Sequence, residues 1–411
     1  MNLLTTDILI IGAGPAGSLA AALLHRENFR VLVVEAQTFP RFVIGESLLP
    51  ASLELLAEVG LLAAVEQRQF IVKHGAVFRR GDEVCNFDFE APAYQVPRAD
   101  FDQALAQAVA AQGVDVRFQH RVTAVAFGGG LATATLQQAD GSPLTVHARF
   151  ILDCSGYGRV LPRLLQLELP SSFPPREAVF THVTGDLRPA EREEGKIWVC
   201  VHPAGAWIWI IPFSNGKTSV GVVAAPEFFQ KFPGEPEGQF RAILGGEPNA
   251  ARRLANVQLA MPLQRIGGYA CSVKGLFGPQ YALAGNATEF LDPIFSSGVA
   301  LALASARRAA QVLTRHLRGA PVDWQADYAD HVMQGIDTFR AYVTAWYDGR
   351  LPRIFFAPNP DPGIKRQICS VLAGHAWDRS NPYAVQPNRV LSVLAKVIGE
   401  RSVSEGAPPR T

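Results

Sequence analysis

A glycine turn near the N-terminus places the strongest limit on how this 411-residue chain folds. The apolar, β-branched run Asp7–Ile11 precedes the turn, as expected for a strand buried on both faces of a parallel sheet. A helical run, Ser18–Leu24, follows the turn, and a second apolar strand, Val31–Val34, ends at Glu35. The turn has the G-x-G-x-x-G spacing, in the run Gly12-Ala13-Gly14-Pro15-Ala16-Gly17. This order predicts a βαβ unit of the Rossmann type.

Each part of this unit has a mechanical reason to bind a dinucleotide. We expect Gly12 to permit the tight turn, Gly14 to let the backbone approach a pyrophosphate, and Gly17 to let the helix pack closely. The pyrophosphate would lie at the helix N-terminus, where unpaired N–H groups and the helix dipole favour negative charge. Glu35, followed by Ala36, lies 23 residues after Gly12 and is expected to accept hydrogen bonds from the adenosine ribose. An acidic residue here disfavours the 2′-phosphate of NADP, so the unit predicts FAD or NAD.

Two later segments favour FAD over NAD. Phe150–Gly156 predicts a strand that ends in a Ser-Gly turn. Tyr281–Val299 predicts a strand, a small-residue turn and a proline loop, followed by a helix over Ser297–Leu317. This arrangement returns the chain to the cofactor late in the sequence. No second G-x-G-x-x-G follows a strand, so a dedicated NAD(P)H domain is not expected, and Gly128–Gly130 predicts a hairpin turn instead.

These segments resemble the flavoprotein family with the p-hydroxybenzoate-hydroxylase-like fold. The resemblance implies that FAD contacts the late turn, the Ser-Gly turn, the start of the long helix, one strand and an arginine before a helix. The corresponding residues are Gly285, Asn286, Ala287, Gly156, Pro293, Gly298, Val122 and Arg98. Asn286 departs from the Asp usual in the family, and it keeps the hydrogen-bonding capacity while losing the charge. The alternative for Arg98 is a solvated arginine at a helix start.

Three further segments resemble the flavin-dependent halogenases of this fold, and among them the branch that acts on phenols and pyrroles. Pro40–Pro50 resembles a Gly-Glu-Ser segment beside the flavin ring, which would bring to the cofactor Arg41, Gly45, Glu46 and Ser47. Trp207–Pro212 is a W-x-W-x-I-P motif, and Lys73–Phe78 resembles a K-x-G-x-x-F motif. The resemblance implies that reduced FAD, O₂ and chloride or bromide give hypohalous acid, which Lys73 relays to an aromatic ring. Phe295 stands where members that halogenate tryptophan carry Glu, which favours activated phenol or pyrrole rings.

Each halogenase assignment has an alternative. Lys73 would act as a hydrogen-bond donor to hypohalous acid or as an N-halo-lysine, and the second role needs a desolvated amine; otherwise it is a surface lysine at a strand start. Backbone N–H groups of Ser297 and Gly298 would bind halide, or this loop only caps the helix and binds FAD. The tryptophan motif would form a wall on the substrate side, or it is ordinary core packing, at Trp207, Trp209 and Pro212.

The expected fold is α/β: a Rossmann-type FAD-binding domain with an inserted antiparallel β-sheet substrate domain and a C-terminal helical segment. The FAD-binding domain takes residues 1–75, 98–170 and 268–320, and the sheet domain takes residues 76–97 and 171–267. The C-terminal helices occupy 321–400, with helices expected at 322–347, 364–372 and 390–398 and a proline loop over 352–362. A tail over 401–411, disordered from Ser402, would follow.

Composition and charge limit the partners. With 38 basic and 37 acidic residues, no nucleic acid or anionic membrane is expected. Five scattered cysteines without a C-x-x-C pair predict free thiols in a reducing compartment, with no metal site. No basic segment precedes the apolar stretch Ile8–Leu24, and no other apolar run approaches the ~20 residues of a membrane span, so we expect a cytoplasmic protein.

The expected partners are a separate flavin reductase and an aromatic substrate, either a free small molecule or one tethered to a carrier protein. Two other functions stay open at this point. One is an FAD-dependent monooxygenase or dehydrogenase/reductase that does not halogenate. The other is an FAD-binding scaffold protein without redox turnover.

Overall fold

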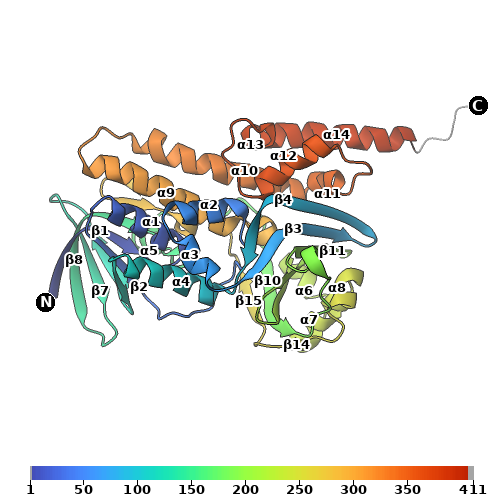
Figure 1. The fold of residues 1–411 in the computed structure, drawn as a ribbon, viewed down its shortest axis with the longest axis horizontal. Coiled ribbons are helices and arrows are strands. Elements are labelled where there is room, and N and C mark those ends of the chain that lie inside the picture. Colours follow the sequence, from blue (N-terminus) through green and yellow to red (C-terminus); the bar gives the residue numbers. More distant parts are fainter. Residues whose placement is uncertain (1, 406–411) are drawn as a thin grey trace, which may run out of the picture. The chain divides into compact units, whose positions relative to one another are not determined.

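The computed structural model describes residues 2–405, which form two compact units. Of these residues, the first unit takes 2–70, 96–173 and 270–333, and the second takes 71–95, 174–269 and 334–405. Figure 1 labels the helices and many of the strands. The predicted α/β fold is confirmed, and each unit is described below by itself.

The first unit is built on a mainly parallel sheet. Its strand order is β17 (Phe277–Gly278), β18 (Tyr281–Leu283), β8 (Pro143–Asp153), β1 (Asn2–Ile11), β2 (Val31–Glu35) and β5 (Asp115–Phe118). β1 pairs in parallel with β2 and β8, and β8 pairs in parallel with β18. β6 (Arg121–Ala126) and β7 (Ala132–Gln137) form the hairpin predicted around Gly128–Gly130, and β7 joins β8. A short antiparallel pair, β9 (Glu168–Pro170) and β16 (Cys271–Val273), completes the strands.

Helices cover this sheet. The long helix α9 (Ser297–Leu317) has the predicted bounds, and it contacts α1 (Pro15–Arg26). α1 begins three residues earlier than Ser18, because proline is well accommodated at the first helical position. The remaining helices are α2 (Pro50–Glu58), α3 (Leu62–Glu66), α4 (Arg98–Ala111) and α5 (Val160–Leu164). Buried alanines at 20–22 let α1 approach its neighbours closely.

The second unit is built on a mainly antiparallel sheet. Its order is β14 (Gln258–Leu259), β10 (Glu177–Thr184), β13 (Lys217–Ala224), β12 (Ala206–Pro212), β11 (Ile197–His202), β3 (Ile71–Arg80) and β4 (Glu83–Gln95), with β15 (Gln264–Gly267) also on β10. Only the β11–β3 pair is parallel among these ladders. An apolar core lies between this sheet and α6 (Pro226–Phe229), α7 (Pro236–Gly245) and α8 (Pro248–Arg253).

The C-terminal segment differs in detail from the prediction. The helix expected over 322–347 is a π-helical turn, Gln325–Ala329, continued by α10 (Asp330–Tyr347). The expected proline loop contains α11 (Arg350–Phe355), because Pro352 lies in the first turn, where no N–H is needed. α12 (Pro362–Leu372), α13 (Pro382–Val385) and α14 (Pro387–Glu405) all begin at a proline. The tail expected to be disordered is helical over 402–405, and its residues 406–411 lie outside the described part.

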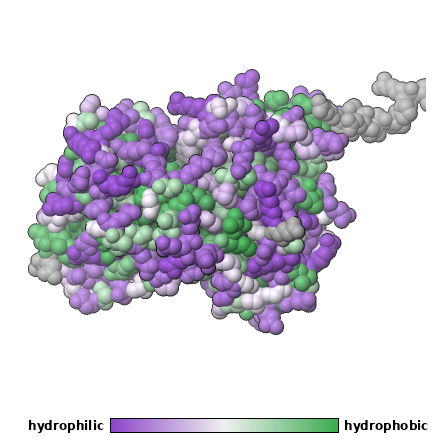
Figure 2. Space-filling model, in the orientation of Figure 1, coloured by the Kyte–Doolittle hydropathy of each residue, from purple (hydrophilic) through white to green (hydrophobic). Residues whose placement is uncertain are grey.

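Among residues 2–405, no helix combines the length and the apolar character required to cross a bilayer. Hydrophilic residues dominate the face shown in Figure 2, and smaller hydrophobic patches lie between them.

Candidate active site

Three turns meet in the first unit at the carboxyl ends of neighbouring parallel strands, β1, β8 and β18. The backbone N–H of Cys154, just after β8, donates to the carbonyl of Ile11 at the end of β1 over 2.8 Å. The N–H of Ala284, just after β18, donates to the carbonyl of Asp153 over 2.8 Å. Ligand crevices of open α/β sheets form outside this edge. The turns therefore lie side by side where a nucleotide is expected.

The glycines of the first turn have different structural roles. Gly12 has φ +99°, and a Cβ there would lie 2.6 Å from the carbonyl oxygen of Cys154. A Cβ on Gly17 would lie 1.9 Å from the carbonyl oxygen of Gly12. Beyond its chain neighbours, a Cβ on Gly14 would meet no atom closer than 3.6 Å, a nitrogen of Arg41. Packing thus requires the first and third glycines, whereas a Cβ on Gly14 would make only ordinary contacts. Gly14 also precedes α1 without a side-chain cap, so the helix start keeps N–H groups for a ligand.

Glu35 lies at the end of β2 and is buried against the glycine turn. Its Oε2 accepts a hydrogen bond from the N–H of Ala13 at 3.1 Å, and its Oε1 accepts one from the N–H of Gln37 at 3.0 Å. The carboxylate therefore braces the turn in addition to any contact with a ribose. Ala36 follows it and is half-buried.

Two arginines share one buried carboxylate next to Gly14. Arg98, the first residue of α4, donates from Nε and Nη2 to Asp102 over 2.8 and 3.0 Å. Arg41 donates to the same carboxylate over 3.0 Å. Arg98 also donates to the carbonyl oxygens of Ile44 and Gly45, over 3.2 and 3.3 Å. Burial opposes charge on Arg98, but Asp102 outweighs it and raises the pKa of the guanidinium.

This cluster corrects the view of Arg98 as a solvated residue, since the ion pair holds it inside the unit. It also adds Asp102, which the sequence reasoning missed although its spacing of four from Arg98 on a helix was readable. Glu46 also acts on Arg98 electrostatically, so the two guanidinium groups are held among two carboxylates close to Gly14. The guanidinium N–H groups, together with the uncapped start of α1, fit the diphosphate of FAD.

The Gly-Glu-Ser segment lies against this cluster. Gly45 has φ +111°, and a Cβ there would lie 3.1 Å from a nitrogen of Arg98. Glu46 and Ser47 are buried, and the carbonyl of Glu46 accepts the N–H of Val96 at 2.7 Å. The segment is thus held by the residues that start α4. Val122 on β6, by contrast, belongs to the apolar core of the unit.

The late turn contacts the start of α1. Gly285 has φ +63°, and a Cβ on it would lie 3.4 Å from the Cβ of Ala16. Its N–H donates to Oγ of Ser305 on α9 over 2.9 Å. Ala287 is fully buried, and Asn286 is half-buried with its carbonyl engaged by an arginine. The first and last motifs of the predicted FAD site, nearly 270 residues apart, are therefore in contact.

That arginine, Arg159, connects the turn after β8 to the turn after β18. It was not identified from the sequence. It follows Gly156, which has φ +59°, and its side chain is buried. Nη1 donates to the carbonyl of Asn286 over 3.1 Å, Nη2 donates to the carbonyl of Ser272 over 2.9 Å, and Nε pairs with Glu168 at 2.9 Å. An isolated arginine after a Ser-Gly turn carries no local signal of such a role.

The loop before α9 leaves the helix start uncapped by a side chain. Ser296 has φ +56° and no side-chain hydrogen bond to the helix, while Asp292 accepts the N–H of Ile294 in the Pro293 turn at 3.0 Å. Ser297 is buried, and a Cβ on Gly298 would lie 3.3 Å from the ring of Phe290. No side chain caps this helix start, and the choice between a halide site and a loop that only caps the helix and binds FAD stays open. The free N–H groups of this 21-residue helix are available to a ligand.

Lys73 lies in the second unit, inside β3, and is only 1% exposed. Its Nζ lies 5.2 Å from the ring centroid of Phe89. Burial lowers the pKa of this amine from 10.5 to about 7. A β-bulge follows it, where a Cβ on Gly75 would lie 1.9 Å from the carbonyl oxygen of Phe87. The alternative of a surface lysine is therefore wrong.

The tryptophan motif fills β12, which is buried on both faces. The indole N–H of Trp207 donates to the hydroxyl of Tyr347 over 3.0 Å, and that of Trp209 donates to Oγ of Ser219 over 3.0 Å. A Cβ on Gly221 would lie 2.1 Å from the Trp209 ring, so the glycine makes room for it. Pro212 ends the strand. Both indole N–H groups of the motif are thus hydrogen-bonded within the second unit. A role of the motif as a substrate wall stays a prediction.

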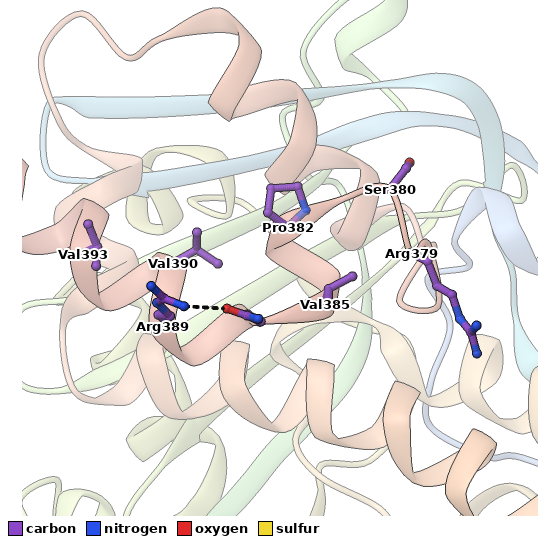
Figure 3. Close-up of a pocket in the computed structure, with 8 residues that line it drawn as sticks. Arg379, Ser380, Pro382, Val385, Arg389, Val390 and Val393 are labelled. Carbon is purple, nitrogen blue, oxygen red and sulfur yellow. Dashed lines mark hydrogen bonds between the residues drawn. The ribbon is translucent and has the colours of Figure 1, made fainter. Parts of the chain in front are cut away.

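A hollow of about 530 Å³ lies on α13 and α14, lined by Pro382, Val385, Val390, Arg379 and Arg389 among others (Figure 3). Its lining contains no Asp, Glu, His, Lys or Cys, and its polar members are Arg379, Ser380, Gln386 and Arg389. It is therefore a poor candidate for the reaction centre. Among the described residues, no cluster of His, Cys, Asp and Glu could hold a metal ion, and the cysteines are free thiols.

Comparison with known proteins gives the family. The FAD binding domain family matches residues 5–244. The flavin-dependent halogenase armH3 of Armillaria mellea is 30% identical over 345 residues, which take in 77% of this chain and 68% of that one. A 1H-pyrrole-2-carbonyl-[peptidyl-carrier protein] chlorinase of Pseudomonas fluorescens is 26% identical over 406 residues, 90% of this chain and 89% of that one.

Among solved structures, a flavoprotein/dehydrogenase from Cytophaga hutchinsonii is 47% identical with a TM-score of 0.94, and the match covers 97% of this chain and 100% of that one. This chain spans about two thirds of the length of the Armillaria halogenases. The chain belongs to the FAD-binding flavoenzyme family, in the group that contains the flavin-dependent halogenases.

Proposed function

We propose that this enzyme uses reduced FAD, O₂ and chloride or bromide to halogenate an activated aromatic ring of the phenol or pyrrole type. The observation that carries the proposal is the fully buried Lys73 within the K-x-G-x-x-F segment, with its pKa lowered to about 7. Lysine side chains are rarely buried, and strongly perturbed pKa values are common at functional sites. The pyrrole chlorinase relative supports the substrate class.

FAD would be held in the first unit by the glycine turn, Glu35, the Arg41–Asp102–Arg98 cluster and the Gly285–Ala287 turn. Bound and reduced, it supplies the two electrons that turn O₂ and halide into hypohalous acid. The guanidinium groups of Arg41 and Arg98 would donate hydrogen bonds to the diphosphate. The uncapped N–H groups of Ser297 and Gly298 would bind the halide.

Lys73 would pass the halogen to the substrate. Near pH 7 half of this buried lysine is neutral amine, which is nucleophilic, so burial favours the N-halo-lysine route over the ammonium donor route. The amine nitrogen attacks the halogen of hypohalous acid, the oxygen–halogen bond breaks, and hydroxide leaves with the proton released from nitrogen as water. The N–halogen bond then delivers electrophilic halogen to the ring. Buried Phe295, in place of a Glu, offers no carboxylate for this step.

The remaining partners follow from the same proposal. No motif for a nicotinamide domain is present in the sequence, so a separate reductase would supply reduced FAD. The substrate is a free aromatic molecule or one tethered to a carrier protein, as in the name of the pyrrole chlorinase. The free thiols support a reducing cytoplasm as the site of action.

The test supplies reduced FAD, O₂ and bromide, with phloroglucinol as a phenol-type acceptor and monochlorodimedone as a trap for free hypobromous acid. We expect bromide-dependent aryl bromide from the natural enzyme and a loss of more than 100-fold in Lys73→Ala. Substitution of the exposed Lys217 by Ala serves as the matched control. Absence of any bromide-dependent product would refute halogenation.

A second candidate function is a dehydrogenase or monooxygenase that does not halogenate, which the 47% identity to the Cytophaga flavoprotein/dehydrogenase favours. Reduction of bound FAD by an organic substrate without O₂, or a hydroxylated product without halide, would select it. A protein that binds FAD but never turns it over would instead be a scaffold.

A further inference from the structure

One polar side chain interrupts the apolar buried face of β4, which lies beside Lys73. On either side of the β-bulge in this strand, where Ala91 is exposed, the alternate residues are buried and apolar: Cys85, Phe87, Phe89 and Ala93. Gln95 continues the alternation and is 0% exposed. An uncharged amide on such a face costs stability unless both of its polar ends are satisfied.

Only one end of the Gln95 amide is satisfied. Its Nε2 donates to the carbonyl oxygen of Gly195 over 3.0 Å. Because that neighbour is an acceptor, the nitrogen must face it, and the orientation of the amide is settled. Its Oε1 is buried and accepts no hydrogen bond within residues 2–405. The amide oxygen of Gln95 is thus a buried hydrogen-bond acceptor without a donor on this face.

The strand register brings this oxygen to the side of the sheet that carries Lys73. Lys73 pairs with Ala93, and Ile71 pairs with Gln95, in the antiparallel β3–β4 ladder. Directly paired residues point to the same face, so Lys73 and Gln95 are diagonal neighbours on one face. Diagonal neighbours lie about 7 to 8 Å apart at their backbones, within reach of two long side chains.

We propose that the amide oxygen of Gln95 and the amino group of Lys73 form a binding site for hypohalous acid. This inference rests on the proposed function. The O–H of the acid donates to Oε1 of Gln95, which turns the halogen toward Nζ of Lys73. Nitrogen then forms its bond to halogen as the oxygen–halogen bond breaks, and the departing hydroxide takes the proton from nitrogen to give water. A hydrogen-bond acceptor at this position suits a neutral protic oxidant and repels halide.

The test measures what fraction of the hypobromous acid made by the enzyme ends as aryl bromide. Reduced FAD, O₂ and bromide are supplied to the complete enzyme, and aryl bromide from phloroglucinol is divided by total oxidant, measured separately with monochlorodimedone. Gln95→Met keeps the side-chain length without the amide, and we expect this ratio to fall about tenfold. Ile71→Val, on the same face, is the matched control for lost packing and should keep the ratio of the natural enzyme.

A second variant separates binding from folding. Gln95→Glu restores an acceptor oxygen and adds a negative charge, which should recover much of the ratio and shift the pH of half-maximal aryl bromination upward, as a merely structural residue would not. An unchanged ratio in Gln95→Met overturns the inference while leaving the proposed function intact. A natural enzyme that produces no hypobromous acid overturns both.

Discussion

Replacing Lys73 by Met should stabilise the protein, and the gain should shrink as the pH rises. The folded protein holds this lysine with a pKa of about 7, against 10.5 when it is hydrated. At 1.36 kcal/mol for each pH unit of difference, burying the ammonium costs about 5 kcal/mol. Between these two pKa values the unfolded chain binds more protons than the folded one, so the stability of the natural protein rises with pH.

The size of the effect follows from this linkage. The cost is fully present below pH 7 and vanishes above 10.5, which leaves about 4 kcal/mol at pH 7 and about 2 kcal/mol at pH 9. The advantage of Lys73→Met over the natural protein should therefore fall by about 2 kcal/mol between these two pH values. Any change in packing from the methionine is the same at both pH values and cancels.

The assay is urea unfolding at pH 7 and pH 9, followed by the fluorescence of tryptophans in the same sheet. Lys196→Met is the control, because Lys196 is equally buried but paired with Asp88 at 2.7 Å and with Glu193. Burial lowers the pKa of Lys196, but these carboxylates outweigh it and raise the pKa, so its loss should destabilise at both pH values. An advantage of Lys73→Met that is equal at pH 7 and 9 would show that Lys73 stays charged in the fold.

Three other outcomes test the site. With Lys73 acting as an amine, aryl halogenation should increase from pH 6 to 8 with a midpoint near 7, and a decrease over this range would favour the ammonium as donor. Arg98→Met should raise the dissociation constant of FAD at least tenfold in a flavin fluorescence titration, because a guanidinium group beside the diphosphate is lost; unchanged affinity would contradict that position. Gly12→Ala should lower the melting temperature markedly, since its Cβ would lie 2.6 Å from the carbonyl of Cys154, whereas Gly14→Ala should spare the fold and weaken FAD binding, as thermal scans with and without FAD can show.

The motifs that the sequence predicted correctly are those whose signal is local. The βαβ unit, the hairpin at Gly128–Gly130 and the helix Ser297–Leu317 each follow from a run of neighbouring residues. Their backbone conformations depend on glycine freedom and apolar periodicity over a few turns of chain. The prolines at 352 and 362 misled the prediction of a loop over 352–362, because a proline in the first turn of a helix and one that ends a helix look alike without the partners of the helix.

The amino-acid sequence by itself determined the conformation of the dinucleotide-binding turn and revealed the segments that resemble flavoproteins and halogenases. Each of these features depends on residues within one short stretch of chain. Only the tertiary structure decided that Arg98 and Arg41 share Asp102, 61 positions from Arg41, and that Arg159 joins two turns. The same holds for Lys73, whose charge depends on how completely distant strands exclude water from it. Burial and charge compensation are sums over all neighbours in space, and those neighbours come from positions that the chain order does not place together.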